Sequence, residues 1–112
     1  YRMEDNGKSI VVCTDIEHGN FVLPEIVEFC KDADLLVHDA QYTNEELETH
    51  RGWGHSSYDQ AIEVAERANV KKLIITHHDP DHNDEFLTKI EKECQKKYPN
   101  CVLAKEGMEI IL

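Results

Sequence analysis

The fold is decided by the sequence DLLVHD at residues 34–39, a short apolar run with polar residues at both ends. This pattern is typical of a strand that is buried on both faces of a sheet. Residues 9–15, rich in β-branched side chains, and residues 73–76 have the same character, and polar residues follow each of them. We therefore predict three buried strands, each of which delivers polar side chains at its end.

Helical segments separate these strands. Pro24 suits the first turn of a helix, and Ser56 or Ser57 suits the N-cap of a second helix with an apolar face at helical spacing. Residues 83–98 carry the same periodicity. The alternation of strands and helices predicts an α/β fold with one β-sheet and helices packed on one side.

The ends of the chain add shorter elements. Asn6-Gly7 is a strong turn dipeptide, and it predicts a hairpin between a short first strand and the strand at residues 9–15. The remaining predictions are a helical turn at residues 43–47 and two final strands at residues 101–104 and 108–112.

Composition limits the classes of function. The chain of 112 residues has 23 acidic and 12 basic residues and a formal net charge of −11, which disfavours non-specific adhesion to nucleic acid. It does not exclude a phosphate substrate held by metal ions, which reverse the local field. No apolar run is long enough to span a membrane. The four cysteines lie in or beside apolar segments, so we expect free, buried thiols in a cytoplasmic protein.

Aspartate and histidine residues follow the ends of the predicted strands. Asp15, the pair His38-Asp39 and His77 follow three strands of the predicted sheet, and ligands bind beyond the carboxyl ends of such strands. Imidazole and carboxylate are ligands of zinc, manganese and iron, so these residues together favour a metal hydrolase. Taken singly, each has an ordinary explanation, because an aspartate after a strand often caps a turn and a lone histidine is often structural.

Four motifs carry a family resemblance. They are TD at residues 14–15, ADLLVHDAQY at 33–42, GHSS at 54–57 and LIITHHDP at 73–80. In this order they resemble the C-terminal half of a metallo-β-lactamase-fold hydrolase, in the phosphodiesterase branch that includes ribonuclease Z and cyclic-nucleotide phosphodiesterases. The resemblance implies a four-layer αββα fold, to which this chain contributes one sheet and its helices.

The resemblance also implies roles for individual residues. Asp15 matches the carboxylate that bridges two divalent metal ions, and His77 matches a histidine ligand of the second one. His55 matches a histidine near the scissile phosphate that protonates the leaving oxygen, and Asp39, beside His38, matches the acidic residue that orients it. We therefore expect His55, Asp39 and His38 to be catalytic. The two metals would be zinc, with manganese or iron as alternatives.

One motif of the family is absent from these 112 residues. The His-x-His-x-Asp-His segment, which supplies most of the metal ligands in the family, has no counterpart here. We therefore expect residues 1–112 to be the C-terminal half of a larger domain and to be inactive alone. We also expect the chain to pair with the missing half, or with a second copy of itself, through an uncovered apolar sheet face.

The resemblance leaves the substrate open. The acidic charge, and Asp39 where ribonuclease Z has Glu, lead us to expect cyclic nucleotides or other small phosphodiesters, with no strong nucleic-acid binding and no membrane partner. The alternatives within the superfamily are RNA processing and the hydrolysis of another ester or a lactam. The alternative outside it is a non-catalytic α/β interaction module.

Overall fold

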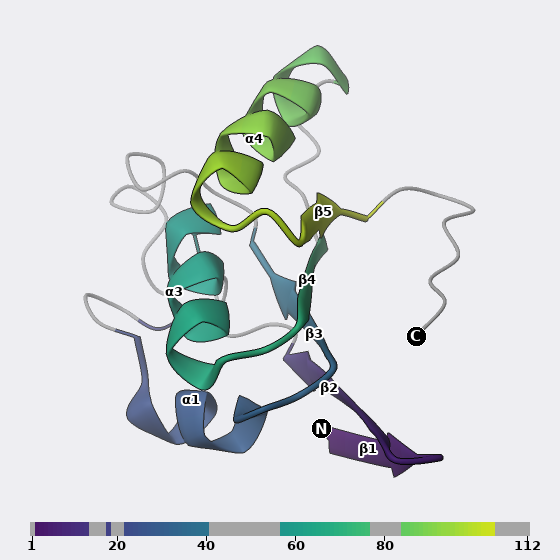
Figure 1. Ribbon diagram of the computed structural model, residues 1–112. Coiled ribbons are helices and arrows are strands. Elements are labelled where there is room, and N and C mark those ends of the chain that lie inside the picture. Colours follow the sequence, from purple (N-terminus) through teal and green to yellow (C-terminus); the bar gives the residue numbers. More distant parts are fainter. Residues whose placement is uncertain (1, 14–17, 19–21, 41–56, 77–83, 105–112) are drawn as a thin grey trace.

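A five-stranded mixed sheet forms the centre of the computed structural model (Figure 1), which describes residues 2–13, 18, 22–40, 57–76 and 84–104. The strands follow one another across the sheet in sequence order. They are β1 (Arg2–Asp5), β2 (Lys8–Cys13), β3 (Leu35–Asp39), β4 (Lys72–Thr76) and β5 (Cys101–Leu103). The β1–β2 pair is antiparallel and the other pairs are parallel, so β2 to β5 share one carboxyl edge.

Among the described residues, three helices cover one face of this sheet. They are α1 (Pro24–Cys30), α3 (Tyr58–Ala68) and α4 (Asp84–Lys97). In Figure 1, α1 and α3 lie beside each other on one side of the strands, and α4 follows on toward β5. This arrangement confirms the predicted α/β fold with helices on one side.

The strand register explains which side is covered. Two rows of side chains face the helices and are all buried: Val11, Leu36, Leu73 and Cys101 in one, and Cys13, His38, Ile75 and Leu103 in the other. The residues between them point to the opposite face, because side chains alternate along a strand. That face carries Val12, Val37, Ile74 and Val102, and no helix among the described residues packs against it.

The first hairpin has the predicted turn. Asn6 and Gly7 both adopt positive φ angles, of 50° and 75°, as a two-residue type I′ turn requires. Asparagine and glycine tolerate this left-handed backbone at the least cost, which explains why the dipeptide was informative in the sequence. The hairpin places β1 at the outer edge of the sheet.

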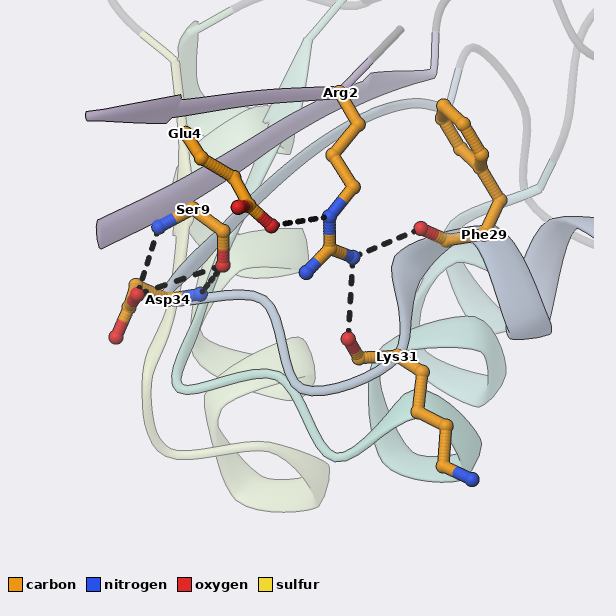
Figure 2. A network of polar contacts seen from close by, with 6 residues as sticks. All are labelled: Arg2, Glu4, Ser9, Phe29, Lys31 and Asp34. Carbon is orange, nitrogen blue, oxygen red and sulfur yellow. Dashed lines mark hydrogen bonds and ion pairs between the residues drawn. The ribbon is translucent and has the colours of Figure 1, made fainter. Parts of the chain in front are cut away.

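Arg2 ties this edge strand to α1 (Figure 2). Its Nη1 donates to the carbonyl oxygens of Phe29 at 3.0 Å and Lys31 at 3.1 Å, which lie at the C-terminal end of the helix. The last carbonyls of a helix have no partner within it, and a guanidinium satisfies them while offsetting the negative end of the dipole. Glu4 accepts from Arg2 Nε at 3.4 Å and helps to orient it.

Asp34 joins the starts of β2 and β3. Its Oδ2 accepts from the Ser9 backbone N–H at 2.8 Å, and its own N–H donates to Ser9 Oγ at 3.3 Å (Figure 2). Lys71 Nζ lies 2.9 Å from Oδ1. The Ser9 hydrogen bond, followed by Lys71, holds the pKa of Asp34 below its usual range. These contacts stabilise the amino edge of the sheet, opposite to the edge where the candidate residues lie.

Ser57 is the N-cap of α3 and forms a complete capping box. Its Oγ accepts from Gln60 N at 3.2 Å, and Gln60 Oε1 accepts from Ser57 N at 3.1 Å. The helix ends at Asn69, whose left-handed conformation (φ 57°) lets its N–H bond back to the last turn. Ser57 therefore determines where the helix begins, two residues after His55.

Ser57→Ala is expected to lower the free energy of unfolding by about 1–2 kcal/mol, because a buried helix start loses its capping oxygen. Urea unfolding followed by circular dichroism measures the loss. Glu66→Ala, at an exposed position of the same helix, is the control and should change stability by less than about 0.5 kcal/mol. Equal effects of the two substitutions would contradict the role of the cap.

The remaining predictions about the fold divide into two groups. The structure confirms the helix at Pro24, the helix at residues 83–98 and the strand at 101–104. It also confirms that all four thiols are buried and free, and Cys13 Sγ lies 3.7 Å from Cys30 Sγ. The helical turn at 43–47 and the last strand at 108–112 fall outside the described residues. Within the described ranges, no helix is long and apolar enough to cross a membrane.

Candidate functional site

Strands β2, β3 and β4 bring three of the predicted motifs to one edge of the sheet. They are parallel neighbours, with Cys13 opposite His38 and Asp39 opposite Thr76. Asp15 follows the end of β2 by two residues, and His77 follows the end of β4 directly. The strands that precede the two predicted metal ligands in the sequence therefore lie on either side of the strand that ends with His38 and Asp39.

Only two of the five candidate residues belong to the described part of the chain. His38 and Asp39 end β3, and both are fully buried, with 0% of each residue exposed. Asp15, His55 and His77 lie outside the described residues, so their roles stay predictions. Among the described residues, no group of three or more His, Cys, Asp or Glu side chains could hold a metal ion.

His38 pairs with a residue that the sequence reasoning did not assign. Its Nε2 lies 3.1 Å from Nε2 of His18, which is itself only 5% exposed. The two rings are nearly parallel, with an angle of 19° between their planes and 5.3 Å between their centroids. His18 therefore lies against the end of β3, although 20 residues separate the two histidines in the sequence.

The neighbours of the two rings determine which nitrogen carries each proton. The Leu23 N–H donates to His18 Nδ1 at 2.9 Å, so that nitrogen is an acceptor and neutral His18 carries its proton on Nε2. His18 Nε2–H then donates to His38 Nε2. His38 in turn carries its proton on Nδ1 and donates it to the backbone oxygen of Asp39 at 2.6 Å. Both nitrogens of both rings are thus used while both rings are neutral.

Burial favours this neutral form. It lowers the pKa of His38 to about 4, and the neighbouring His18 adds to the effect, while the Asp39 backbone hydrogen bond and carboxylate oppose it. Asp39 Oδ1 lies 3.9 Å from His38 Nδ1. Burial also lowers the pKa of His18. Protonating His38 would place two donors face to face at the Nε2–Nε2 contact, and protonating His18 would place a second donor against the Leu23 N–H.

The protein is expected to lose stability as the pH falls from about 6.5 toward 4. His38 titrates near 6.5 when unfolded and near 4 when folded, so the unfolded state binds more protons in that range. A difference of about 2.5 in pKa corresponds to about 3 kcal/mol in the free energy of unfolding. This contribution is present above pH 6.5 and is lost progressively below it. Urea unfolding at pH 7, 5.5 and 4 measures this, and His38→Gln, which cannot titrate, should have a shallower dependence. Equal slopes would contradict the neutral state of His38.

The sequence contained one signal for His18. Seven histidines in 112 residues is a high count, and the segment that carries His18 has neither strand nor helix periodicity. No rule of spacing connects residue 18 with residue 38, because the contact depends on the path of the chain between β2 and α1. The pairing could therefore not be predicted from the sequence, and only the structure shows it.

Comparison with known proteins connects this arrangement to one superfamily. The profile of the Beta-lactamase superfamily domain matches residues 1–78. Ribonuclease Z of Bacteroides fragilis (strain YCH46) is 33% identical over 111 residues, which cover 99% of this chain and 34% of the relative. Ribonuclease Z of Prochlorococcus marinus (strain NATL1A) is 34% identical over 109 residues, which cover 95% and 33%. The chain thus spans about a third of the length of these relatives.

Solved structures agree on the fold. The metallo-β-lactamase fold protein YhfI of Bacillus subtilis superimposes with a TM-score of 0.75 at 22% identity, over 96% of this chain and 41% of that one. The short form of human tRNase Z superimposes with a TM-score of 0.65 at 24% identity, over 91% and 32%. The predicted metallo-β-lactamase fold is therefore confirmed.

The comparisons contradict our expectation about partners. We expected a small phosphodiester and no strong nucleic-acid binding, whereas the curated relatives are ribonucleases, which act on RNA. Two signals misled the prediction. The net charge of −11 is a sum over a chain that spans a third of its relatives' length, so it does not describe the surface that meets the substrate. Asp39 in place of Glu differs by one methylene, which a small backbone shift can offset.

Proposed function

Because this chain belongs to the β-lactamase superfamily domain family, we propose that the protein containing it is a metal-dependent hydrolase that cleaves phosphodiester bonds in RNA. The observation that carries the proposal is the 33–34% identity to ribonuclease Z over nearly the whole chain. The order of β2, β3 and β4 supports it, because the strands that precede Asp15 and His77 in the sequence are parallel neighbours of the strand that ends with His38 and Asp39.

Asp15 and His77 are the metal ligands that this chain would contribute. A carboxylate can bridge two cations, a neutral imidazole suits zinc, and manganese or iron are alternatives for the same donors. When bound, two such cations would lower the pKa of water and offset the charge of the phosphodiester. Two ligands are fewer than a catalytic zinc normally has, so we propose that residues 1–112 form the C-terminal half of the domain and that the other half supplies the rest.

His55 would donate the proton to the leaving oxygen. In the sequence, His55 precedes Ser57, the buried N-cap of α3, by two residues. Asp39 would accept from His55, fix one tautomer and stabilise its protonated form. A fully buried carboxylate suits this task, since its field is little screened by water.

His38 would act through its neighbours. Its ring is fully buried and both of its nitrogens are hydrogen-bonded, to His18 and to the Asp39 backbone. We therefore assign it the task of holding the end of β3, which carries Asp39. The four buried free thiols suit a reducing compartment, so we also propose that the protein acts in the cytoplasm.

A substrate panel tests the proposal. The full protein, loaded with zinc, is incubated with a labelled transcript that contains a tRNA, with cyclic AMP, with bis(p-nitrophenyl) phosphate and with nitrocefin. We expect cleavage of the RNA that stops when a chelator is added, together with slow turnover of bis(p-nitrophenyl) phosphate. Turnover of cyclic AMP or nitrocefin without RNA cleavage would refute the RNA substrate, and no turnover of any compound would favour a non-catalytic module.

A further inference from the structure

Helix α4 presents a row of lysines to solvent. Its buried residues are Ile90 and Cys94, with 8% and 4% exposed, and both belong to the hydrophobic core. The opposite side of the helix is exposed, because side chains repeat every 3.6 residues around the axis. At the centre of that side, three and four residues apart, lie the side chains that we call the lysine face of α4: Lys89, Lys92 and Lys96.

The charges of the lysine face are not neutralised by ion pairs. Elsewhere Arg67, Lys71 and Lys97 each form an ion pair with a carboxylate. Within the part of the chain that the structure describes, no carboxylate lies within ion-pair distance of the lysine face. The exposed acids of the same helix are Glu85 in the first turn and Glu93 at the flank of the face. The face therefore keeps its positive charge in a chain whose net charge is −11.

Two hydrogen bonds between α4 and β5 set the direction of the lysine face. Glu91 Oε2 accepts from the Leu103 N–H at 2.9 Å, and Gln95 Nε2 donates to the carbonyl oxygen of Cys101 at 3.0 Å. The helix therefore runs antiparallel to β5, beside which it lies in Figure 1. From its C-terminal to its N-terminal end, the lysine face extends toward the carboxyl edge of the sheet.

This direction brings the lysine face to the level of the candidate site. Leu103 pairs with Ile75 and Ile75 pairs with His38, so these residues form one row across the sheet. Lys92 directly follows the glutamate that accepts from Leu103. Neighbouring strands lie about 4.8 Å apart, so β5 lies about 10 Å from the strand that ends with Asp39. A nucleic-acid strand covers that distance in about three nucleotides, at about 3.4 Å each.

We infer that the lysine face of α4 contacts the phosphate backbone of the RNA substrate beside the reaction centre. The inference rests on the proposed function for the identity of the substrate, and on the geometry of α4 for the surface. Lysine binds phosphate as a point charge whatever the base sequence, so such contacts position the RNA without reading it. The acidic charge of the rest of the chain disfavours RNA on other faces and directs it to this one.

Substitution of all three lysines tests the surface. Fluorescence anisotropy measures binding of a labelled transcript that contains a tRNA to the full protein, with a chelator present so that the RNA stays intact. We expect Lys89→Gln, Lys92→Gln and Lys96→Gln together to weaken binding by about 10–100-fold at about 0.1 M salt. The slope of log affinity against log salt should become shallower by about 2–3, since each lost phosphate contact reduces it by about 1. Replacement of the same lysines by arginine, which keeps the charge, should preserve both values.

Lys8→Gln combined with Lys31→Gln is the matched control. Both lysines are exposed and lie at the amino edge of the sheet, where β2 starts and α1 has ended. Their removal should change affinity by less than about two-fold, because salt screens charges far from the RNA. Lys92→Gln combined with Lys96→Gln makes the same change in net charge and should reduce the salt slope by about 2. Equal losses for the two double variants would overturn the assignment, because they would show a response to net charge alone.

Vesicles of phosphatidylcholine and phosphatidylserine test a different anionic partner. We expect no cosedimentation of the protein with them, because the apolar side of α4 is buried in the core and has nothing to insert into a membrane. Cosedimentation that is lost in the triple glutamine variant, while that variant still binds RNA as the wild type does, would overturn the assignment to RNA in favour of a lipid surface.

Cleavage by the metal-loaded protein separates failure of the inference from failure of the proposed function. The KM for the transcript should rise in the triple glutamine variant by the same factor as the binding affinity falls. RNA binding that depends on the lysine face, without cleavage at any metal content, would support the surface and refute the hydrolase. Metal-dependent cleavage with unchanged KM, affinity and salt slope in the triple glutamine variant would support the hydrolase and overturn the surface.

Discussion

Asp15→Asn is expected to weaken metal binding by more than about 100-fold and to reduce RNA cleavage by at least the same factor. Loss of a direct ligand should exceed the 10–100-fold effect of losing a residue that only supports one. Asparagine keeps the volume of the side chain but removes its charge and one of the two oxygens that can each bind a cation. Metal content after gel filtration, measured by mass spectrometry, gives the result directly.

Asp59→Asn is the matched control for this substitution. It makes the same chemical change in α3, where Asp59 forms a surface ion pair with Lys97 at 2.7 Å. A surface pair of this kind contributes less than about 1 kcal/mol, so metal content and cleavage should match the wild type. If Asp15→Asn also retained its metals, Asp15 would not be a ligand.

His55→Ala is expected to lower kcat for RNA cleavage by about 10²–10⁴-fold, the usual contribution of a general acid. The loss should be much smaller with bis(p-nitrophenyl) phosphate, because p-nitrophenolate leaves without being protonated. The variant should also lose the alkaline limb of the pH–rate profile, which reports deprotonation of the acid. Steady-state kinetics with both substrates between pH 6 and 9 measures all three effects.

His50→Ala serves as the control for the loss of a histidine side chain. It should retain the activity and pH profile of the wild type with both substrates. An equal loss for His55→Ala with both substrates would contradict proton donation, since a residue that only binds the phosphate would act on both alike. Retained metal content in His55→Ala would show that the change is confined to the proton transfer.

Local sequence patterns predicted most of the fold. Asn6-Gly7 predicted the hairpin, Pro24 predicted the start of α1, and the apolar run at residues 34–39 predicted β3. For α3 the sequence offered Ser56 or Ser57 as the N-cap, and the structure has Ser57. Each of these signals acts through backbone preferences over a few residues, so the amino-acid sequence contains it directly. The packing of the helices on one side followed from the strand–helix alternation.

The candidate site was only partly predictable. The positions of His38 and Asp39 at the end of β3 followed from the same local patterns. The pairing of His18 with His38 did not follow from local patterns, because no periodicity marks the residues around His18. The contact depends on the β2–β3 ladder, which sets Cys13 opposite His38. The expectation of a small phosphodiester, with RNA processing as the alternative, was wrong for a different reason, since net charge sums over a surface without saying where the charges lie.

Metal reconstitution of the full protein tests the central claim most directly. The protein is stripped with a chelator, zinc is returned in steps, and cleavage of the tRNA-containing transcript is measured at each step. We predict no cleavage without metal, and a rise that saturates near two metal ions per chain. Undiminished cleavage by the metal-free protein, or no cleavage at any metal content, would contradict the assignment of this chain to a two-metal ribonuclease.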